Sequence, residues 1–188
     1  LVVTDAMLVE IGLVTPITDA LSAANVESAV YSGVEPDPTF AHVDEGLALF
    51  DAEGCDAVLA IGGGSPMDAA KVIAAMATNR VPVRKLEGQL KVRKAPAPLY
   101  AIPTTAGTGS EVTIAAVVSE PDTHTKRFFV DPKLLPRAVA LDPTLMTGLP
   151  QTEPGRVTPG HWMIQGTRMP PSYNDPLCPR RGRFVVAL

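Results

Sequence analysis

The chain has few of the residues that define several large classes of protein. It holds only two cysteines, Cys55 and Cys178, in 188 residues, which is too few for a disulfide framework, so we expect a reducing, cytoplasmic setting. Acidic residues outnumber basic ones by 20 to 16, giving a net charge of −4, which argues against a general nucleic-acid binder. No apolar run reaches the length of a membrane span.

The N-terminus lacks the features of a secretory signal. It begins Leu1-Val2-Val3-Thr4, without methionine and without the basic region that opens a signal peptide. These residues instead resemble a strand entered partway. We therefore expect that the natural N-terminus lies upstream.

Strand and helix patterns alternate over residues 1 to about 150. Pro16 stands at a first-turn position, and Val43, Leu47 and Phe50 recur at helical spacing. Strands are expected at 2–5, 28–31, 56–61 and 99–103, and helices from 15, from 38 and over 66–77. This alternation of continuous apolar strands with helices predicts an α/β fold, a Rossmann-like parallel sheet with flanking helices.

The composition changes from about Gln151 onward. Residues 151–188 contain six of the 19 prolines, five arginines and no lysine, and no helical period lasts more than one turn. Residues 184–188 could form a strand, but the sequence offers no obvious partner for it. We expect two parts, a folded domain at 1–150 and an irregular, poorly ordered Pro/Arg-rich tail at 151–188.

The first motif with chemical content is Gly62-Gly63-Gly64-Ser65, which separates an apolar strand from a helix. Glycines let a backbone approach a ligand closely, and helix N-termini attract anions, so a phosphate site is predicted. A plain strand-to-helix turn is the alternative. Asp68 follows Ser65 at capping-box spacing, and Lys71 could pair with Asp68 on the same helix face.

The second motif follows another apolar strand, at residues 103–113. Four hydroxyl side chains and two glycines fall within residues 104–110, donors that suit a pyrophosphate or a nicotinamide amide. A solvated Thr/Gly loop is the alternative. Because ligands in open α/β sheets bind beyond the carboxyl ends of the strands, two such loops on neighbouring strands favour one shared site.

Together the two loops resemble a known family. Gly-Gly-Gly-Ser-Pro-x-Asp-x-x-Lys at 62–71 is followed by Pro-Thr-Thr-Ala-Gly-Thr-Gly-Ser-Glu-Val-Thr at 103–113, a pair that resembles iron-containing (group III) alcohol dehydrogenases. Three further stretches agree in order, at 31–38, 131–136 and 138–143. The resemblance covers residues 1 to about 150. It implies a dehydroquinate synthase-like N-terminal domain that binds NAD or NADP.

The resemblance assigns cofactor contacts by position. Gly63, Gly64 and Ser65 of the first loop would hold the cofactor's pyrophosphate. Thr104, Thr105 and Thr108 of the second loop would contact its phosphates and nicotinamide end. Thr113 and Val117 would line the nicotinamide side, and Lys126 would reach a ribose hydroxyl. The full set is Ser32, Gly63, Gly64, Ser65, Asp68, Thr104, Thr105, Thr108, Thr113, Val117 and Lys126. Val117 could instead be a core residue and Lys126 a solvated surface lysine.

Ser32 departs from the NAD-preferring members of the family, which often carry aspartate there. An aspartate would bond the adenosine 2′-hydroxyl and repel a 2′-phosphate. Serine removes that repulsion, so both NAD and NADP remain admissible.

The metal half of the family's site is not visible in the sequence. The family follows this point with a segment like Thr-Gly-Met-Asp-Ala-Leu-Thr-His-Ala-Ile-Glu, whose Asp and His hold Fe²⁺ or Zn²⁺. Those two positions would fall at about Gly160 and Ile164, neither of which can ligate through a side chain. His161 alone makes no site, and His42 and His124 match no ligand position. We therefore expect no metal ligands, no catalytic residues and no helical C-terminal domain, and a truncated or frame-shifted reading frame.

The activity implied by the resemblance is hydride transfer between a small alcohol or aldehyde and nicotinamide, by a homo-oligomer when full length. We expect this chain to keep the cofactor half only, to be inactive alone, and to expose an apolar patch that favours aggregation. One alternative is a non-catalytic dinucleotide-binding module. Another is a different metal-dependent relative, such as a glycerol dehydrogenase, a dehydroquinate synthase-like enzyme or, as the nearer rival, a maleylacetate reductase.

Overall fold

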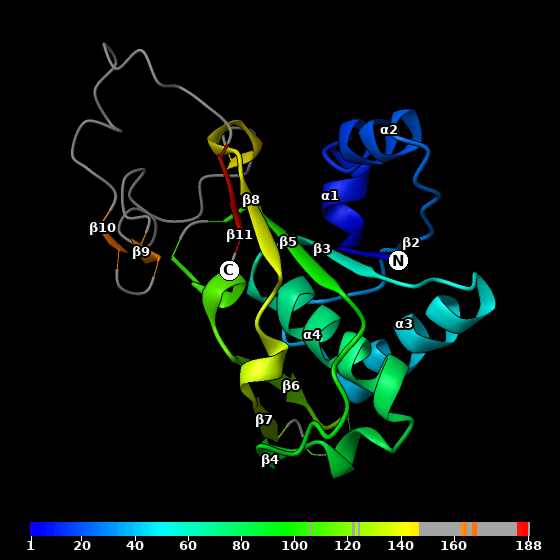
Figure 1. Ribbon diagram of the computed structural model, residues 1–188, viewed down its shortest axis with the longest axis vertical. Helices are drawn as coiled ribbons and strands as arrows, with labels where there is room; N and C mark the ends of the chain where they lie inside the picture. The colour runs from blue at the N-terminus through cyan, green and yellow to red at the C-terminus, as the bar shows by residue number, and fades with distance from the viewer. Residues whose placement is uncertain are drawn as a thin grey trace.

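A computed structural model describes residues 1–105, 107–121, 123 and 125–146, and the backbone of three strand segments at 163–164, 167–168 and 184–187. Within these residues, six strands form the main sheet in the order β11-β8-β5-β3-β1-β2 (Figure 1). All neighbours pair parallel except β11, which runs antiparallel to β8. The strands are β1 (Val2–Val3), β2 (Val30–Tyr31), β3 (Val58–Gly62), β5 (Leu99–Pro103), β8 (Ala138–Leu141) and β11 (Phe184–Ala187).

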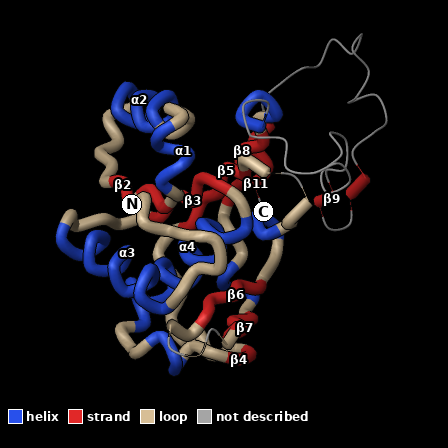
Figure 2. The backbone as a smooth tube through the Cα atoms, turned by 180° about the vertical axis from the view of Figure 1, so that it is seen from behind, coloured by secondary structure: helices blue, strands red, loops and turns tan. Residues whose placement is uncertain are grey.

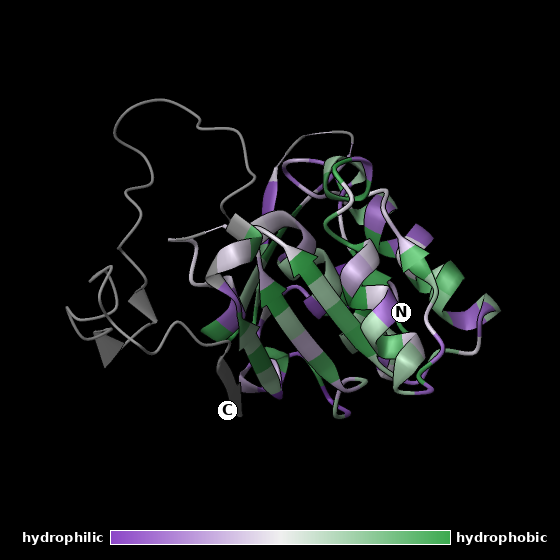
Figure 3. Cartoon of the chain, turned by 90° about the horizontal axis from the view of Figure 1, so that it is seen from above, coloured by the Kyte–Doolittle hydropathy of each residue, from purple (hydrophilic) through white to green (hydrophobic). Residues whose placement is uncertain are grey.

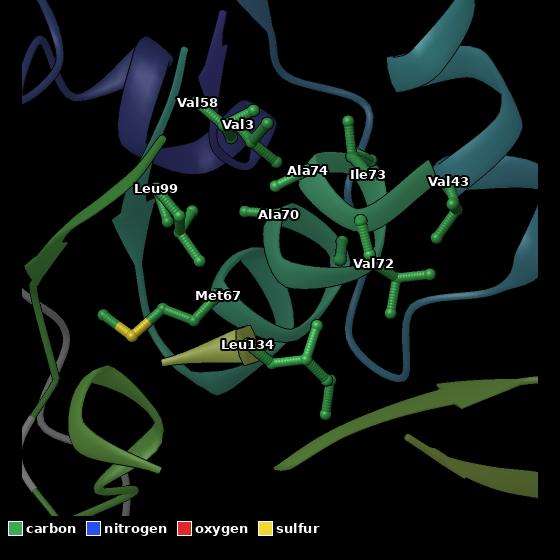
Figure 4. Packing of buried hydrophobic residues seen from close by; sticks show 14 of the residues in the cluster. Val3, Val43, Val58, Met67, Ala70, Val72, Ile73, Ala74, Leu99 and Leu134 are labelled. Atoms are coloured by element: carbon green, nitrogen blue, oxygen red, sulfur yellow. The ribbon is translucent and has the colours of Figure 1, made fainter. Parts of the chain in front are cut away.

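Helices cover both faces of the main sheet. Because successive strand residues point to opposite faces, each strand contributes side chains to both of the cores that these helices cover. Val3 and Val58 join the larger core with α3 (Phe40–Ala52) and α4 (Gly64–Asn79) (Figure 4). Val2 and Ile61 form a second cluster with α1 (Ala6–Glu10) and α2 (Thr15–Ala23). Figure 3 shows the strands of this sheet as largely hydrophobic ribbons. The predicted α/β architecture is confirmed.

A second, three-stranded sheet lies beyond α4, on the side away from α1 and α2 (Figure 2). It consists of β4 (Gly88–Gln89), β7 (Lys126–Val130) and β6 (Ala115–Ser119), in that order. Phe129 is 1% exposed and packs with Val118 in the larger core. α4 is therefore enclosed between two sheets, and 11 of its 16 residues are buried.

Short elements complete the described chain. Single turns of 3-10 helix cover Val83–Lys85, Ser110–Val112, Pro132–Leu134 and Pro143–Met146, and β9 (Met163–Ile164) pairs antiparallel with β10 (Thr167–Arg168). In the described part of the chain, no helix has both the length and the apolar character required to cross a bilayer.

The expected strands and helices correspond to β1, β2, β3, β5, α2, α3 and α4, with ends shifted by a few residues. The sequence reading did not predict α1, β8 or the three-stranded sheet. It suggested a strand at residues 184–188 without identifying a partner, and Phe184–Ala187 does form a strand, which pairs antiparallel with β8. An antiparallel edge strand distant in sequence leaves no local signal of its partner.

Candidate functional site

The N-terminus of α4 forms one wall of the candidate site. β3 ends at Gly62, whose φ of +146° is a conformation that L-residues rarely adopt, and a Cβ there would lie 2.7 Å from Pro66 Cγ. The turn therefore requires glycine at this position. Gly63 is the N-cap and the helix begins at Gly64, so its first N–H groups have no partner within the helix.

The predicted capping box at Ser65 and Asp68 is wrong. Ser65 is the second residue of α4 rather than its cap, because the glycine turn lets the helix begin earlier. The Asp68 carboxylate instead reaches the three-stranded sheet, where Oδ2 accepts the N–H of Val117 at 3.0 Å. Asp68 thus connects α4 to β6 rather than capping the start of the helix.

The second predicted loop lies against the first, as expected for neighbouring parallel strands. β3 and β5 pair from Val58 with Leu99 to Gly62 with Pro103, and the Thr104 N–H donates to the Gly62 carbonyl at 3.0 Å. Both loops therefore leave the sheet at its carboxyl edge, where α/β proteins bind ligands.

Threonines of the second loop face the glycines of the first. A Cβ built on Gly63 would lie 3.0 Å from Thr105 Oγ1, and one on Gly64 would lie 3.6 Å from Thr108 Cγ2. Any side chain at these glycines would fill the space between the loops. Thr105 Oγ1 is itself buried with no hydrogen-bond partner in the described protein, which is unusual for a buried hydroxyl.

Lys71 does not form the predicted ion pair with Asp68. Its Nζ donates to Thr113 O at 2.9 Å, Thr113 Oγ1 at 2.9 Å and Ala115 O at 2.7 Å. The side chain is completely enclosed, with the residue only 1% exposed. Burial lowers the pKa of Lys71 to about 8, although the carboxylates of Asp68 and Glu111 act to raise it.

Two acidic residues share this enclosed region with Lys71. Burial raises the pKa of Asp68, against the opposing effects of the Val117 N–H, Lys71 and Ser110. Burial also raises the pKa of Glu111, which is 5% exposed. Sequence reasoning counted Ser110 among the four hydroxyls of the second loop but named neither Ser110 nor Glu111 as a site residue. Their position directly after Thr108 and Gly109 was the available signal.

The adenosine-side predictions lie on other loops. Ser32 is half-buried directly after β2, next to the bridge between Asp5 and Gly33. Lys126 is 57% exposed and pairs with Asp37 at 3.0 Å, in keeping with the surface alternative. Among described residues, no hydrogen bond or ion pair joins Ser32 or Lys126 to the α4 N-terminus.

Within the described residues, no group of three or more His, Cys, Asp and Glu side chains could hold a metal ion. His42 is used locally, since its Nδ1 accepts the N–H of Thr39 at 3.1 Å before α3. The other predicted positions concerning the metal, His124, His161, Gly160 and Ile164, lie outside the residues whose side chains are described.

Comparison with known proteins identifies relatives of this arrangement. The model of the family "iron-containing alcohol dehydrogenase" matches residues 1–143. The chain is 43% identical over 152 residues to lactaldehyde reductase of Escherichia coli (strain K12), covering 80% of this chain and 40% of the relative. It is 39% identical over 150 residues to the NAD-dependent methanol dehydrogenase of Bacillus methanolicus, covering 80% and 39%.

Solved structures give the same result. A 1,3-propanediol oxidoreductase superimposes with a TM-score of 0.77 at 38% identity, covering 79% of this chain and 39% of the other. A sulfoacetaldehyde reductase from Bifidobacterium kashiwanohense in complex with NAD⁺ gives a TM-score of 0.70 at 32% identity, again with 79% and 39% covered. The chain spans about 40% of the length of the curated relatives it matches.

Proposed function

Because this chain belongs to the iron-containing alcohol dehydrogenase family, we propose that residues 1–150 bind a nicotinamide dinucleotide, NAD or NADP. The observation that carries the proposal is the meeting of Gly63 and Gly64 with Thr105 and Thr108 at the start of α4. A helix N-terminus offers unpaired N–H groups and the positive end of its dipole to a phosphate. The hydroxyl of Thr105, which is buried and has no hydrogen-bond partner among the described residues, supplies a further donor at the same place.

The other contacts are assigned within this proposal. Ser65 and Thr104 join the pyrophosphate end, and Thr113 and Val117 line the nicotinamide side. We assign Lys126 to a ribose hydroxyl and Ser32 to the adenosine end, where a serine admits either NAD or NADP. Asp68 stays among the proposed contacts, with its Oδ2 also accepting the N–H of Val117.

The reaction we propose for the protein is hydride exchange between a small alcohol or aldehyde and the nicotinamide ring. The names of the relatives support it. In this family's chemistry a metal ion, Fe²⁺ or Zn²⁺, acts as a Lewis acid on the alcohol oxygen. The described residues do not fit such an ion. Their share in the proposal is therefore to bind and orient the dinucleotide.

A second candidate function is dinucleotide binding without turnover. It requires only the glycine turn and the threonine loop, which the described residues bring together. The two candidates make the same prediction for binding and differ in catalysis. Either way, we place the protein in the cytoplasm, in keeping with the free thiol of Cys55, and expect copies to associate through exposed apolar side chains such as Tyr100 and Phe128.

The test is calorimetric titration of the purified 188-residue chain with NAD⁺, NADP⁺ and ADP-ribose. Gly64→Ala should weaken all binding about tenfold or more, since a methyl group would cover the cradle. It should leave the melting temperature unchanged, because its nearest neighbours, Ser110 Oγ and Thr108 Cγ2, lie 3.5 and 3.6 Å away. Ala41→Val, which adds bulk at the exposed start of α3, is the matched control.

Wild-type protein that binds none of the three ligands would refute the proposal. If binding is observed, oxidation of a primary alcohol with added Fe²⁺ separates the candidates. Turnover supports the dehydrogenase, and binding without turnover supports the non-catalytic module.

A further inference from the structure

We propose that Asp68 and Lys71 form an α4 clamp, a pair of positioning residues that takes the place of a missing strand along β6 and thereby fixes the nicotinamide-side wall of the site. The inference rests on the proposed function, because it needs Thr113 and Val117 to line the bound dinucleotide. Of the two clamp residues, Lys71 is assigned no contact with the cofactor.

The evidence for the clamp is the set of backbone groups that Asp68 and Lys71 bond. β6 is the edge strand of the three-stranded sheet; β7 pairs with it on one side, and on the other side a single bridge joins Ser119 to Thr39. Asp68 accepts the N–H of Val117, and Lys71 donates to the carbonyls of Thr113 and Ala115. These are alternate residues, so their polar groups project from the same edge of the strand. That edge is the one β7 leaves unpaired.

Edge strands normally present unpaired N–H and C=O groups to water. Here the edge is turned toward a buried helix, where unsatisfied groups would be costly. The carboxylate of Asp68 can only accept and the ammonium of Lys71 can only donate, which matches the N–H of Val117 and the carbonyls before it. The two residues are three apart on α4 and so share one face of the helix.

This pairing fixes the register of β6 against α4. A shift of one residue would turn the unpaired edge groups away from both side chains. Because α4 also carries the glycine turn, the clamp ties the position of Thr113 and Val117 to that of the phosphate cradle. Thr113 is held twice, since its Oγ1 also accepts from Lys71 at 2.9 Å.

The enclosure of Lys71 argues for a specific role. Lysine is almost never fully buried unless paired, yet this residue is 1% exposed and lies more than 4 Å from any carboxylate among the described residues. A hydrophobic side chain would avoid burying the charge, but would remove the Lys71 donor from the Thr113 carbonyl and leave the Ala115 carbonyl only the Thr113 hydroxyl at 3.3 Å.

The test compares two ligands that differ at one end, on the whole 188-residue chain. Asp68→Ala and Lys71→Met should weaken NAD⁺ binding by about tenfold. They should change ADP-ribose affinity by less than about twofold, because that ligand lacks the nicotinamide. Asp68→Asn should recover most of the loss, since its amide oxygen can still accept from Val117. Asp44→Ala and Lys85→Met, at exposed positions, are the matched controls.

Equal loss of both ligands would overturn the clamp in favour of a general structural role, as would unchanged NAD⁺ binding. Hydrogen exchange in the ligand-free protein tests the clamp separately from the proposed function. The Val117 amide should exchange faster in Asp68→Ala while amides of β5 stay protected. Unchanged exchange at Val117 would refute the clamp even if the wild-type protein binds NAD⁺. Wild-type protein that binds neither ligand would refute the proposed function instead.

Discussion

Raising the pH should relieve a cost that Lys71 imposes on folding. Burial lowers its pKa from 10.5 to about 8 in the folded protein. Between these values the unfolded chain binds more protons than the folded one, so the free energy of unfolding rises with pH. Each pKa unit corresponds to about 1.36 kcal/mol, so the full difference of roughly 2.5 units is worth about 3 kcal/mol.

Other groups titrate in the same pH range, and their contribution to the free energy of unfolding must be subtracted. Burial raises the pKa of Tyr31, helped by its hydrogen bond to Glu45. That phenol stays protonated in the folded protein while it ionises in the unfolded chain, so Tyr31 lowers stability as the pH rises above about 10. Lys71→Met retains Tyr31 and removes only the ammonium, which makes it the reference.

The assay is urea unfolding followed by circular dichroism, at steps from about pH 7 to pH 10.5, for wild type and Lys71→Met. The difference in unfolding free energy, wild type minus variant, should increase by about 3 kcal/mol across the range, with most of the rise between about pH 8 and 10. A flat difference would mean that the contacts with Thr113 and Ala115 offset the burial completely. A falling difference would place the folded pKa above 10.5 and refute the reasoning.

Two further predictions concern packing and acid stability. Gly46→Ala should lower the melting temperature by about 2–4 °C, because the new Cβ would lie 2.5 Å from the buried Ile73 Cδ1. The destabilisation from overpacking, about 1–3 kcal/mol, exceeds the gain in helix propensity of up to about 1 kcal/mol. A higher melting temperature would contradict this. Glu120→Gln should destabilise the protein at about pH 7 and much less at about pH 3. The hydrogen bond from Arg127 and the charge of Arg84 lower the pKa of Glu120 in the folded protein. The stabilisation that this shift represents is lost as the pH falls below the unfolded pKa of 4.5. Equal losses at the two pH values, measured by thermal unfolding, would count against it.

The parts of the fold that sequence predicted are those with local signals. Apolar runs ending in glycine or proline identified β3 and β5, and helical spacing of Val43 and Phe50 identified α3. β6 and β7 were not predicted from the sequence, although β6 is an apolar run of Ala and Val; β7 begins with two charged residues. The sequence suggested the β11 strand but not its partner, β8, which lies more than forty residues earlier.

The sequence anticipated that the two loops lie side by side, but it misread the partners of the polar residues in α4. Spacing alone suggested that Asp68 caps α4 and that Lys71 pairs with it, since both are local interactions that any helix permits. In the structure both side chains bond a segment more than forty residues later. Such partners depend on the tertiary position of β6, about which helical periodicity carries no information.

The composition of α4 explains why two polar side chains are needed in its middle. Ala69, Ala70, Ala74 and Ala75 are at most 1% exposed, and small side chains allow the helix to approach closely the structures packed around it. Close approach removes the water that would otherwise solvate the edge of β6, so its backbone groups must be satisfied by the helix itself. Two polar residues one turn apart meet that need with complementary charge. The same close packing holds the N-terminus of α4 against the Thr104–Thr113 loop. The helix that carries the glycine turn therefore also fixes the position of Thr113 and Val117 on the opposite side of the site.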